Sequence, residues 1–329
     1  MKNYNKIIIT GITGQDGIFL TQSLLKEGCY KILGTSRSSD HTSFYKKLEY
    51  FNLPIENLEN LEIVKTDLKK PNSLNNILSD FLPDYIYNFS GPSSVYDSFK
   101  NPEKTKIEIV EIFDNLIEFI KNSNKNIILF QASSSEIFGS MEEGGLHENS
   151  LISPKSPYAE AKAEIHNKIE FLRTQIGLQV INGIMFNHES EFRSREYLFT
   201  KIIDSAINIK YKNLKNFTIG SLDIERDWSY SGDIMNGVKL LTESKLNEDF
   251  VLGSGVSTPI KKIVDIVFES LNLKFEDFVT IDESLLRSEE PLIKFSNPKK
   301  IFDAVNWKTT TSVEEILIKN IAYLSNQYN

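Results

Sequence analysis

The chain has 329 residues, of which 40% are hydrophobic and 25% charged, and this suits one or two globular domains with a substantial core. Its net charge of −8, without a basic arm, argues against a nucleic-acid partner, and its single cysteine, Cys29, excludes an intrachain disulfide or a cysteine-rich metal site. No apolar run reaches the ~20 residues that a membrane helix needs, and the residues before the first strand leave no room for a signal peptide. We therefore expect a cytoplasmic protein without a membrane partner.

The first predicted element, strand Lys6–Thr10, runs straight into a glycine-rich turn. Three glycines, Gly11, Gly14 and Gly17, follow at G-x-x-G-x-x-G spacing and lead into the predicted helix Gln15–Lys26. Such a turn lets backbone N–H groups and a helix N-terminus approach a pyrophosphate. A glycine pattern alone is a weak indicator, but its place on the first strand of an alternating β/α chain predicts a dinucleotide site.

Apolar strand-like runs and amphipathic helical runs continue to alternate along the chain. The further predicted strands are Lys31–Thr35, Leu61–Thr66, Asp84–Phe89, Asn126–Ala132 and Gln179–Met185, and the further predicted helices are Ser73–Phe81, Thr105–Lys121 and Ser156–Gln175. This order predicts an α/β fold, with a doubly wound parallel Rossmann sheet in a cofactor-binding domain at residues 1–186. Shorter elements follow, with helices Thr258–Leu271 and Ser312–Ser325, and predict a smaller α/β substrate lobe at residues 187–329.

Residues at the ends of the next strands indicate the kind of dinucleotide. An acid at the end of the second strand is typical of NAD sites, where it binds the ribose 2′-hydroxyl. Here Arg37 comes first, followed by two serines before Asp40. A cation with hydroxyls suits a phosphate, so the sequence favours NADP over NAD, with Asp40 as the residue that favours NAD. Asp67 is placed to accept a hydrogen bond from adenine, and the small residues Ser90 and Gly91 let the backbone lie close to the cofactor.

The spacing Y-x-x-x-K occurs four times, and only context separates the copies. Tyr158 and Lys162 open a predicted helix directly after the fifth strand, at the edge where doubly wound sheets bind ligands. On a helix the two side chains lie one turn apart, so the ammonium lowers the pKa of the phenol from about 10 and makes it a base near neutral pH. Ser134 and Glu136 end the fifth strand, so a hydroxyl, a carboxylate, a phenol and an amine are predicted to converge on a nicotinamide ring.

These residues resemble the GDP-mannose 4,6-dehydratase family of extended short-chain dehydrogenases/reductases. The family's I-T-G-I-T-G-Q-D-G is matched at Ile9–Gly17, its S-P-Y-x-x-x-K at Ser156–Lys162 and its F-N-H-E-S at Phe186–Ser190. The F-N-H-E-S block is typical of this dehydratase rather than of epimerases in general. Blocks at Gly220–Trp228 and Asn297–Trp307 are similar to parts of the family's substrate lobe, so the resemblance covers nearly the whole chain.

The resemblance implies a role for each matching residue. It places the catalytic groups on Ser134, Glu136, Tyr158 and Lys162. Together with the motifs above, it gives as cofactor-binding residues Gly11, Thr13, Gly14, Gln15, Asp16, Gly17, Arg37, Asp67, Leu68, Phe89, Ser90, Gly91, Ser93, Lys162, His188 and Arg193. The residues that it implies for the nucleotide sugar are Ser93, Asn187, Lys201, Arg226, Arg287 and Glu290.

The activity that the resemblance implies is that of a lyase in deoxysugar biosynthesis. A GDP-sugar, for which the resemblance implies GDP-mannose, would be converted to its 4-keto-6-deoxy derivative by internal hydride transfer with NADP. The chain departs from the family where Ser90–Ser94 replaces A-A-Q-S-H, and where Phe192 stands beside Arg193 in place of a second arginine. Three alternatives remain: a nucleotide-sugar epimerase or reductase, a dehydratase for another nucleotide sugar such as GDP-heptose, and a non-enzymatic dinucleotide-binding protein.

The resemblance also implies self-association. The predicted helices Thr105–Lys121 and Ser156–Gln175 match those that pair into a four-helix dimer interface in the family. We therefore expect a homodimer or a homotetramer.

Overall fold

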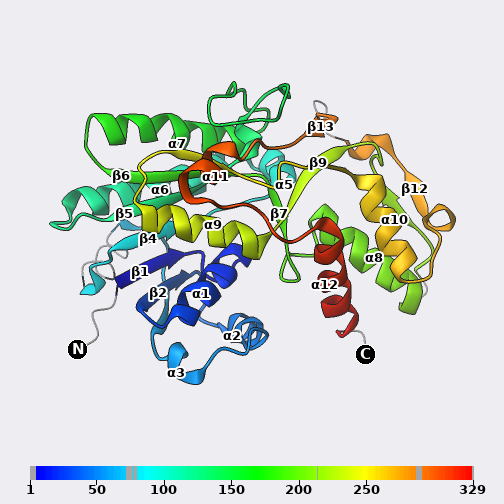
Figure 1. Ribbon diagram of the computed structural model, residues 1–329, viewed down its shortest axis with the longest axis horizontal. Coiled ribbons are helices and arrows are strands. Elements are labelled where there is room, and N and C mark those ends of the chain that lie inside the picture. Colours follow the sequence, from blue (N-terminus) through cyan, green and yellow to red (C-terminus); the bar gives the residue numbers. More distant parts are fainter. Residues whose placement is uncertain (1–4, 72–76, 78–79, 213, 287–290, 328–329) are drawn as a thin grey trace. The chain divides into compact units, whose positions relative to one another are not determined.

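The protein is described by a computed structural model that covers residues 5–71, 77, 80–212, 214–286 and 291–327 (Figure 1). The chain forms two compact units. Unit 1 comprises Met1–Gly139, Glu148–Met185 and Met235–Phe250, and unit 2 comprises Ser140–His147, Phe186–Ile234 and Val251–Asn329. The chain leaves unit 1 for unit 2 between Met185 and Phe186, whereas the sequence placed a domain boundary between residues 186 and 187. The sequence interpretation contained neither the return of residues 235–250 to unit 1 nor the excursion of residues 140–147 into unit 2.

A seven-stranded sheet forms the centre of unit 1. In sheet order its strands are β10 (Asp249–Leu252), β6 (Gln179–Met185), β5 (Ile128–Ser134), β4 (Tyr85–Asn88), β1 (Asn5–Thr10), β2 (Tyr30–Ser36) and β3 (Leu61–Lys65). All neighbouring pairs from β6 to β3 are parallel. The chain builds outward from β1 through β2 to β3 and then returns to β4 on the other side of β1, so the prediction of a doubly wound Rossmann sheet is confirmed.

Strand register explains why these apolar runs form one core. One row of side chains in register crosses five strands, and its members are Leu33, Ile8, Ile86, Leu129 and Val180. All five are buried and belong to a single apolar cluster with helices α6 (Pro102–Asn122) and α7 (Pro157–Thr174). Because successive residues of a strand point to opposite faces, the continuous β-branched runs are buried on both sides of the sheet.

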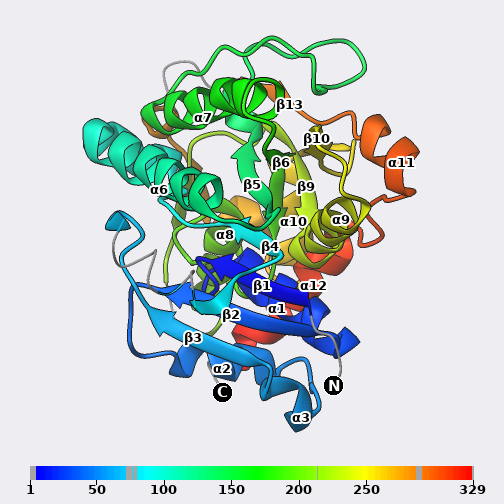
Figure 2. The same cartoon turned by 90° about the vertical axis from the view of Figure 1, so that its left-hand side faces the viewer.

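Helices cover both faces of this sheet. Figures 1 and 2 show α6 and α7 side by side on one face, and α1 (Gln15–Glu27) with α9 (Ser231–Ser244) on the other. An ion pair between Lys239 and Glu27 joins α9 to α1. The smaller elements of this unit are α2 (Thr42–Glu49), α3 (Ile55–Leu58), α5 (Val95–Lys100) and the short 3₁₀ helix η1 (Ser135–Ile137), none of which the sequence predicted.

Unit 2 is built from short strands and four helices among its described residues. Strands β11 (Ser257–Pro259), β9 (Glu225–Tyr230), β13 (Ile293–Lys294) and β7 (Asn187–Glu189) form one sheet, and β12 (Val279–Ile281) pairs with β8 (Phe217–Ile219). The helices are α8 (Leu198–Lys212), α10 (Ile260–Ser270), α11 (Lys299–Val305) and α12 (Val313–Ser325), and the 3₁₀ turns are η2 (Phe275–Asp277) and η3 (Glu283–Leu285). Helices α8, α10 and α12 pack against one another, which gives this unit a core of its own.

Several predicted element ends are wrong for identifiable reasons. Helix α6 begins at Pro102 rather than Thr105, because proline fits the first turn of a helix, where its missing N–H is not needed. The predicted helix Thr258–Leu271 starts too early: Ser257–Pro259 is strand β11, and Pro259 adopts an extended conformation before α10 begins. The predicted helix Ser73–Phe81 lies largely outside the described residues.

Within the part of the chain that the structure describes, no helix combines the length and apolar character needed to cross a bilayer.

Candidate active site

The glycine-rich turn joins β1 to α1 with very little space around it. Gly11 has a φ of +68°, and a Cβ atom there would lie 2.9 Å from the carbonyl oxygen of Phe89. A Cβ atom on Gly17 would lie 2.4 Å from the carbonyl oxygen of Ile12. Gly14 is the N-cap of α1 and supplies no side-chain cap to its first N–H groups. The turn therefore fits a dinucleotide pyrophosphate, which needs close backbone approach and helix N–H donors.

Arg37 and Asp40 behave differently in the loop after β2. The Arg37 side chain is 85% exposed and lies 4.0 Å from the carboxylate of Glu108 on α6. The Asp40 carboxylate accepts a hydrogen bond from the backbone N–H of Thr42 at 2.9 Å. The bonds with Thr42 hold the pKa of the Asp40 carboxyl below its usual value. Asp40 is therefore engaged at the start of α2, whereas the guanidinium of Arg37 extends from the sheet edge.

The loops after β3 and β4 lie at the same edge of the sheet. The carboxylate of Asp67 accepts a bond from the N–H of Lys69 at 3.2 Å, and the carbonyl of Leu68 accepts one from Asn115 on α6 at 2.8 Å. The N–H of Ser90 donates to Asn88 at 3.3 Å. The predicted cofactor residues after β1, β3 and β4 are Thr13, Gln15, Asp16, Asp67, Leu68, Phe89, Ser90, Gly91 and Ser93, and all lie beyond the carboxyl ends of parallel strands.

The four predicted catalytic residues come from three elements of unit 1, namely β5, η1 and α7. Strand β5 ends at Ser134, whose hydroxyl accepts a hydrogen bond from the N–H of Glu136 at 3.2 Å and so begins η1. The turn η1 packs against α7, where Tyr158 and Lys162 lie one turn apart and are both 8% exposed. The Nζ of Lys162 is 5.8 Å from the centre of the Tyr158 ring. The helix is positioned by Ser156, whose hydroxyl caps it by accepting a bond from Ala159 at 3.1 Å.

The environment of Lys162 changes its protonation. Its Nζ donates a hydrogen bond to the carbonyl oxygen of Ala132 at 2.8 Å. Burial lowers the pKa of the Lys162 ammonium to about 8, and the Asp16 carboxylate on α1 acts in the opposite direction. Lysines with a pKa shifted this far by burial are found mainly at functional sites. Asp16 also connects the glycine-rich turn electrostatically with α7.

Sequence reasoning missed a row of buried polar residues beside this lysine. Thr10 donates to Asn88 at 2.7 Å, and Asn88 donates to the Gln131 side-chain oxygen at 2.8 Å. The amide of Gln131 donates to the Ala132 carbonyl at 2.9 Å, so Gln131 and Lys162 share one acceptor. The three polar residues are 0–2% exposed and in register on β1, β4 and β5. Polar residues within otherwise apolar predicted strands were the signal that could have revealed them.

Two predicted cofactor residues, His188 and Arg193, lie in unit 2. His188 is on β7, and its Nδ1 lies 2.7 Å from the carbonyl oxygen of Phe186. A carbonyl only accepts hydrogen bonds, so Nδ1 carries the hydrogen in this contact. The guanidinium of Arg193 lies 3.6 Å from the centre of the Tyr197 ring, and its Nε lies 3.5 Å from the carboxylate of Glu189. Both side chains are therefore held in place by neighbours in unit 2.

The predicted substrate residues are less uniform. Arg226, on β9, is 6% exposed, and its guanidinium donates to the Glu225 carbonyl at 2.7 Å. In strand register it stands beside Lys294 of β13, a buried lysine that the sequence interpretation missed. Asn187 lies on β7, and Lys201 is exposed in the second turn of α8. Arg287 and Glu290 fall outside the described residues.

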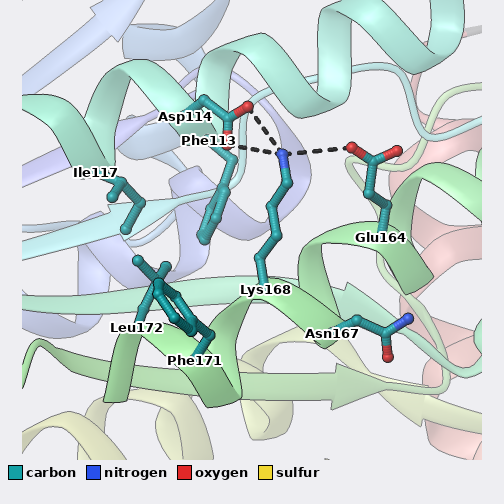
Figure 3. A pocket seen from close by; sticks show the side chains of 8 residues that line it. All are labelled: Phe113, Asp114, Ile117, Glu164, Asn167, Lys168, Phe171 and Leu172. Atoms are coloured by element: carbon teal, nitrogen blue, oxygen red, sulfur yellow. Dashed lines mark hydrogen bonds and ion pairs between the residues drawn. The ribbon is translucent and has the colours of Figure 1, made fainter. Parts of the chain in front are cut away.

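A hollow on α6 and α7 lies apart from all of these residues. It has a volume of about 530 Å³ and is lined by Phe113, Asp114, Ile117, Glu164, Asn167, Lys168, Phe171 and Leu172 (Figure 3). Lys168 projects into it and pairs with Asp114 at 2.9 Å and with Glu164 at 3.3 Å. The lining contains no residue that the sequence predicted as catalytic, cofactor-binding or substrate-binding.

Solved structures with a similar fold include nucleotide-sugar enzymes. A structure of DesIV (dTDP-glucose 4,6-dehydratase) from Streptomyces venezuelae, with NAD and TYD bound, has a TM-score of 0.84 and 19% identity over 98% of this chain and 97% of that chain. A structure of RMD from Pseudomonas aeruginosa complexed with NADPH has a TM-score of 0.79 and 18% identity over 98% of this chain and 99% of that chain. At these identities the likeness concerns the fold alone.

Sequence relatives are more specific. The chain is 30% identical to GDP-mannose 4,6 dehydratase 1 of Arabidopsis thaliana, over 94% of this chain and 87% of the relative. It is 31% identical to a GDP-mannose 4,6-dehydratase of Vibrio cholerae, over 89% and 80%, and 29% identical to the GDP-mannose 4,6 dehydratase of Homo sapiens, over 96% and 90%. The sequence profile described as GDP-mannose 4,6 dehydratase matches residues 8–320. The chain therefore belongs to the GDP-mannose 4,6-dehydratase family.

Proposed function

We propose that the protein is a nicotinamide-dependent lyase that converts GDP-mannose to its 4-keto-6-deoxy derivative, a precursor for deoxysugars. One observation carries this proposal: β5, which ends at Ser134, and the turn η1, which contains Glu136, both pack against α7, the helix of Tyr158 and Lys162. Elimination of water from a sugar needs a carboxylate in addition to the phenol and the amine. In this chain Glu136 supplies that carboxylate from η1, a turn that packs against α7.

Each of the four side chains holds or moves a proton in the proposed reaction. The ammonium of Lys162 stabilises Tyr158 as a phenolate, and this phenolate takes the proton of the C4 hydroxyl. A ketone at C4 makes the C5 hydrogen acidic, and Glu136 removes it. Glu136 then returns the proton to the C6 oxygen, which leaves as water with the assistance of the Ser134 hydroxyl. The proton that Tyr158 holds goes to C5 when C6 is reduced.

A bound nicotinamide cofactor would supply a reversible hydride acceptor for oxidation at C4 and reduction at C6. The residues proposed to hold it are those of the glycine-rich turn, the loops after β3 and β4, and Lys162. The resemblance to the family also assigns His188 and Arg193 to the cofactor. We favour NADP over NAD, because Arg37 extends from the end of β2 while Asp40 is engaged with Thr42. The solved relatives named above were obtained with NAD and with NADPH, so both cofactors occur on this fold.

The experiment is to incubate the purified protein with NADP⁺ and GDP-mannose and to analyse the product by mass spectrometry. We expect a product lighter by one water, and we expect Glu136→Gln to lower turnover by about 10²-fold or more. Glu143→Gln, the same change at an exposed glutamate, is the matched control. Near-normal turnover of Glu136→Gln would instead favour an epimerase or reductase. Dehydration of GDP-heptose but not of GDP-mannose would correct the substrate.

We also propose that the protein is a homodimer or a homotetramer that associates through α6 and α7. The hollow in Figure 3 is mostly apolar, and Phe171 on its rim is 57% exposed. A second copy would bury this surface. Light scattering after size-exclusion chromatography tests the proposal: Phe171→Glu should shift the protein to a monomer, whereas Phe302→Glu, at an exposed phenylalanine of unit 2, should not.

A further inference from the structure

Two cations from different strand ends meet at one carboxylate of unit 1. Glu108, on α6, has a side chain only 14% exposed. Its Oε2 lies 4.0 Å from Nη1 of Arg37, which follows β2, and its Oε1 lies 3.6 Å from Nζ of Lys69, which follows β3. The cluster of Arg37, Glu108 and Lys69 therefore lies at the end of β2, where dinucleotide-binding folds distinguish a 2′-hydroxyl from a 2′-phosphate.

The backbone directs Lys69 toward this cluster. The carboxylate of Asp67 accepts a bond from the Lys69 N–H at 3.2 Å, and the Leu68 carbonyl is fastened to Asn115 on α6 at 2.8 Å. Glu108 and Asn115 are seven residues apart, so they lie on the same face of α6. The loop that carries Lys69 is thus attached to the helix face that carries Glu108.

Charge balance indicates what the cluster can bind. Arg37, Lys69 and Glu108 together leave one net positive charge, in a chain whose total charge is −8. A phosphate monoester carries a charge of about −1.5 to −2 near neutral pH, more than one carboxylate, and it has three acceptor oxygens for two donors. The 2′-hydroxyl of NAD, which is neutral, has no comparable attraction for the two cations.

We propose that Lys69 is a second specificity-determining residue for NADP, acting with Arg37 on the 2′-phosphate. Glu108 is the internal counter-ion that holds both cations until the phosphate takes its place. This inference rests on the proposed function, in which Arg37 alone was assigned to the phosphate. It adds a residue from a different strand end and a competing carboxylate.

The test is direct binding of NADPH and NADH to the purified protein, measured by nicotinamide fluorescence and by calorimetry. Lys69→Met should weaken NADPH binding about tenfold, leave NADH binding within about twofold, and reduce the salt dependence of NADPH binding. Glu108→Gln should strengthen NADPH binding several-fold without changing that of NADH. Lys70→Met, at the exposed neighbouring lysine, controls for loss of charge and should change neither. Circular dichroism shows that each variant is folded.

Two outcomes would overturn the inference. One is an equal loss of NADPH and NADH binding in Lys69→Met, and the other is weaker NADH binding in Glu108→Gln, which would assign Glu108 to the ribose hydroxyl. Arg37→Met separates this inference from the proposed function. If it abolishes the NADPH preference while Lys69→Met does not, only the role of Lys69 fails. If the wild type binds NADH as tightly as NADPH, the NADP assignment itself fails.

Discussion

The two units satisfy their buried polar groups in different ways. In unit 1, the row of Thr10, Asn88 and Gln131 is neutral, and each member bonds to the next. In unit 2, the central group is an ion: Asp227 on β9 is 1% exposed and has its charge inside the fold. Unit 1 thus has a row of neutral hydrogen bonds here, whereas unit 2 has one buried carboxylate that accepts several hydrogen bonds.

Asp227 collects donors from two separate segments of unit 2. The backbone N–H groups of Ser254, Gly255 and Ser296 donate to its carboxylate at 2.8, 3.0 and 3.1 Å, and the hydroxyls of Ser254 and Ser296 donate to it as well. These residues follow β10 and β13, so one carboxylate fastens two loops to β9. A change at this carboxylate weakens or removes the acceptor of all these donors, whereas a change in the neutral row removes only one or two bonds.

The largest expected effect is therefore on Asp227. Asp227→Asn replaces one acceptor oxygen by a donor that faces N–H and O–H groups, and we expect the free energy of unfolding to fall by about 3 kcal/mol. Urea denaturation measures this change. Asp223→Asn, at an exposed aspartate just before the strand, should cost far less. Equal losses in the two variants would contradict the contrast between the units.

Unit 1 also buries a charge, at Lys162. Because burial lowers the pKa of this ammonium, its charge lowers the stability of the fold, whereas the charge of Asp227 supports it. Between pH about 8 and about 10.5 the native Lys162 is neutral while the unfolded chain still holds the proton, so stability rises with pH there. Lys162→Met removes this slope. The free energy of unfolding of Lys162→Met, relative to that of the wild type, should fall by about 3 kcal/mol from the lower to the upper end of that range, because one pKa unit corresponds to about 1.4 kcal/mol.

The Lys162 experiment needs urea denaturation at several pH values. Lys104→Met, at an exposed lysine of α6, should leave the slope unchanged. The Ala132 carbonyl keeps Gln131 as a donor in Lys162→Met, so the variant should remain folded. A slope that persists in Lys162→Met would show that another group causes it.

A smaller loss is expected when the neutral row is interrupted. Gln131→Met keeps the side-chain volume but leaves the Asn88 amide without its acceptor. We expect a loss of about 2 kcal/mol, which is less than for Asp227→Asn, since both partners are uncharged. Thermal and urea unfolding measure it, with Gln175→Met at the exposed end of α7 as control. A loss as large as that of Asp227→Asn would show that the neutral row does not tolerate substitution better than the site around Asp227.

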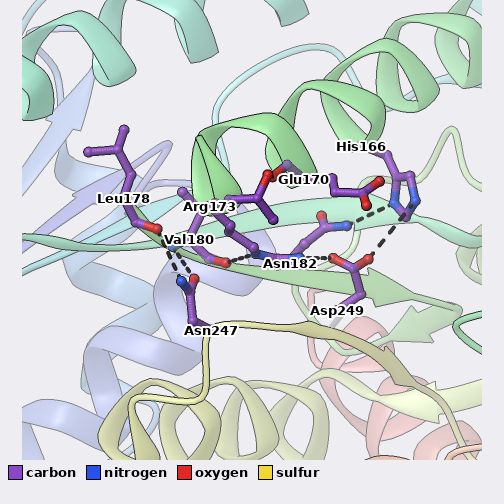
Figure 4. Close-up of polar contacts among 9 residues, drawn as sticks. His166, Glu170, Arg173, Leu178, Val180, Asn182, Asn247 and Asp249 are labelled. Carbon is purple, nitrogen blue, oxygen red and sulfur yellow. Dashed lines mark hydrogen bonds and ion pairs between the residues drawn. The ribbon is translucent and has the colours of Figure 1, made fainter. Parts of the chain in front are cut away.

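The smallest effect should come from His166, which links α7 to the sheet edge beyond the neutral row (Figure 4). Its Nδ1 lies 3.1 Å from the amide of Asn182, and its Nε2 lies 4.0 Å from the carboxylate of Asp249, which Arg173 also binds at 2.9 Å. Burial lowers the pKa of His166, and Arg173 acts in the same direction, while Asp249 and Glu170 oppose them.

This direction sets the sign of a pH effect. Below pH about 6.5 the unfolded state binds a proton that the native His166 does not, so stability falls as the solution is acidified. His166→Gln should remove part of that decline in urea titrations at mildly acidic pH. His41→Gln, in the loop before α2, is the control. An unchanged decline in His166→Gln would assign acid sensitivity to the carboxylates alone.

Local sequence was enough for the elements whose signals are local. The apolar runs predicted six parallel strands to within two residues, since strands buried on both faces are continuously apolar. Ser156 and Ser312 mark helix starts because each caps the N–H three residues ahead, with Glu315 completing a capping box after Ser312. The spacing of Tyr158 and Lys162 placed them on one helix face without knowledge of the rest of the fold.

Tertiary structure alone decided what lies opposite each strand and loop. The register that aligns Asn88 with Gln131, the two loops that donate to Asp227 and the approach of Lys69 to Glu108 join residues that lie 27 to 69 positions apart. No local pattern specifies such partners, because strand pairing and crossover geometry bring them together only when the core closes. The sequence by itself therefore determined which chemical groups the protein carries and on which elements, while the packed fold determined which of them meet.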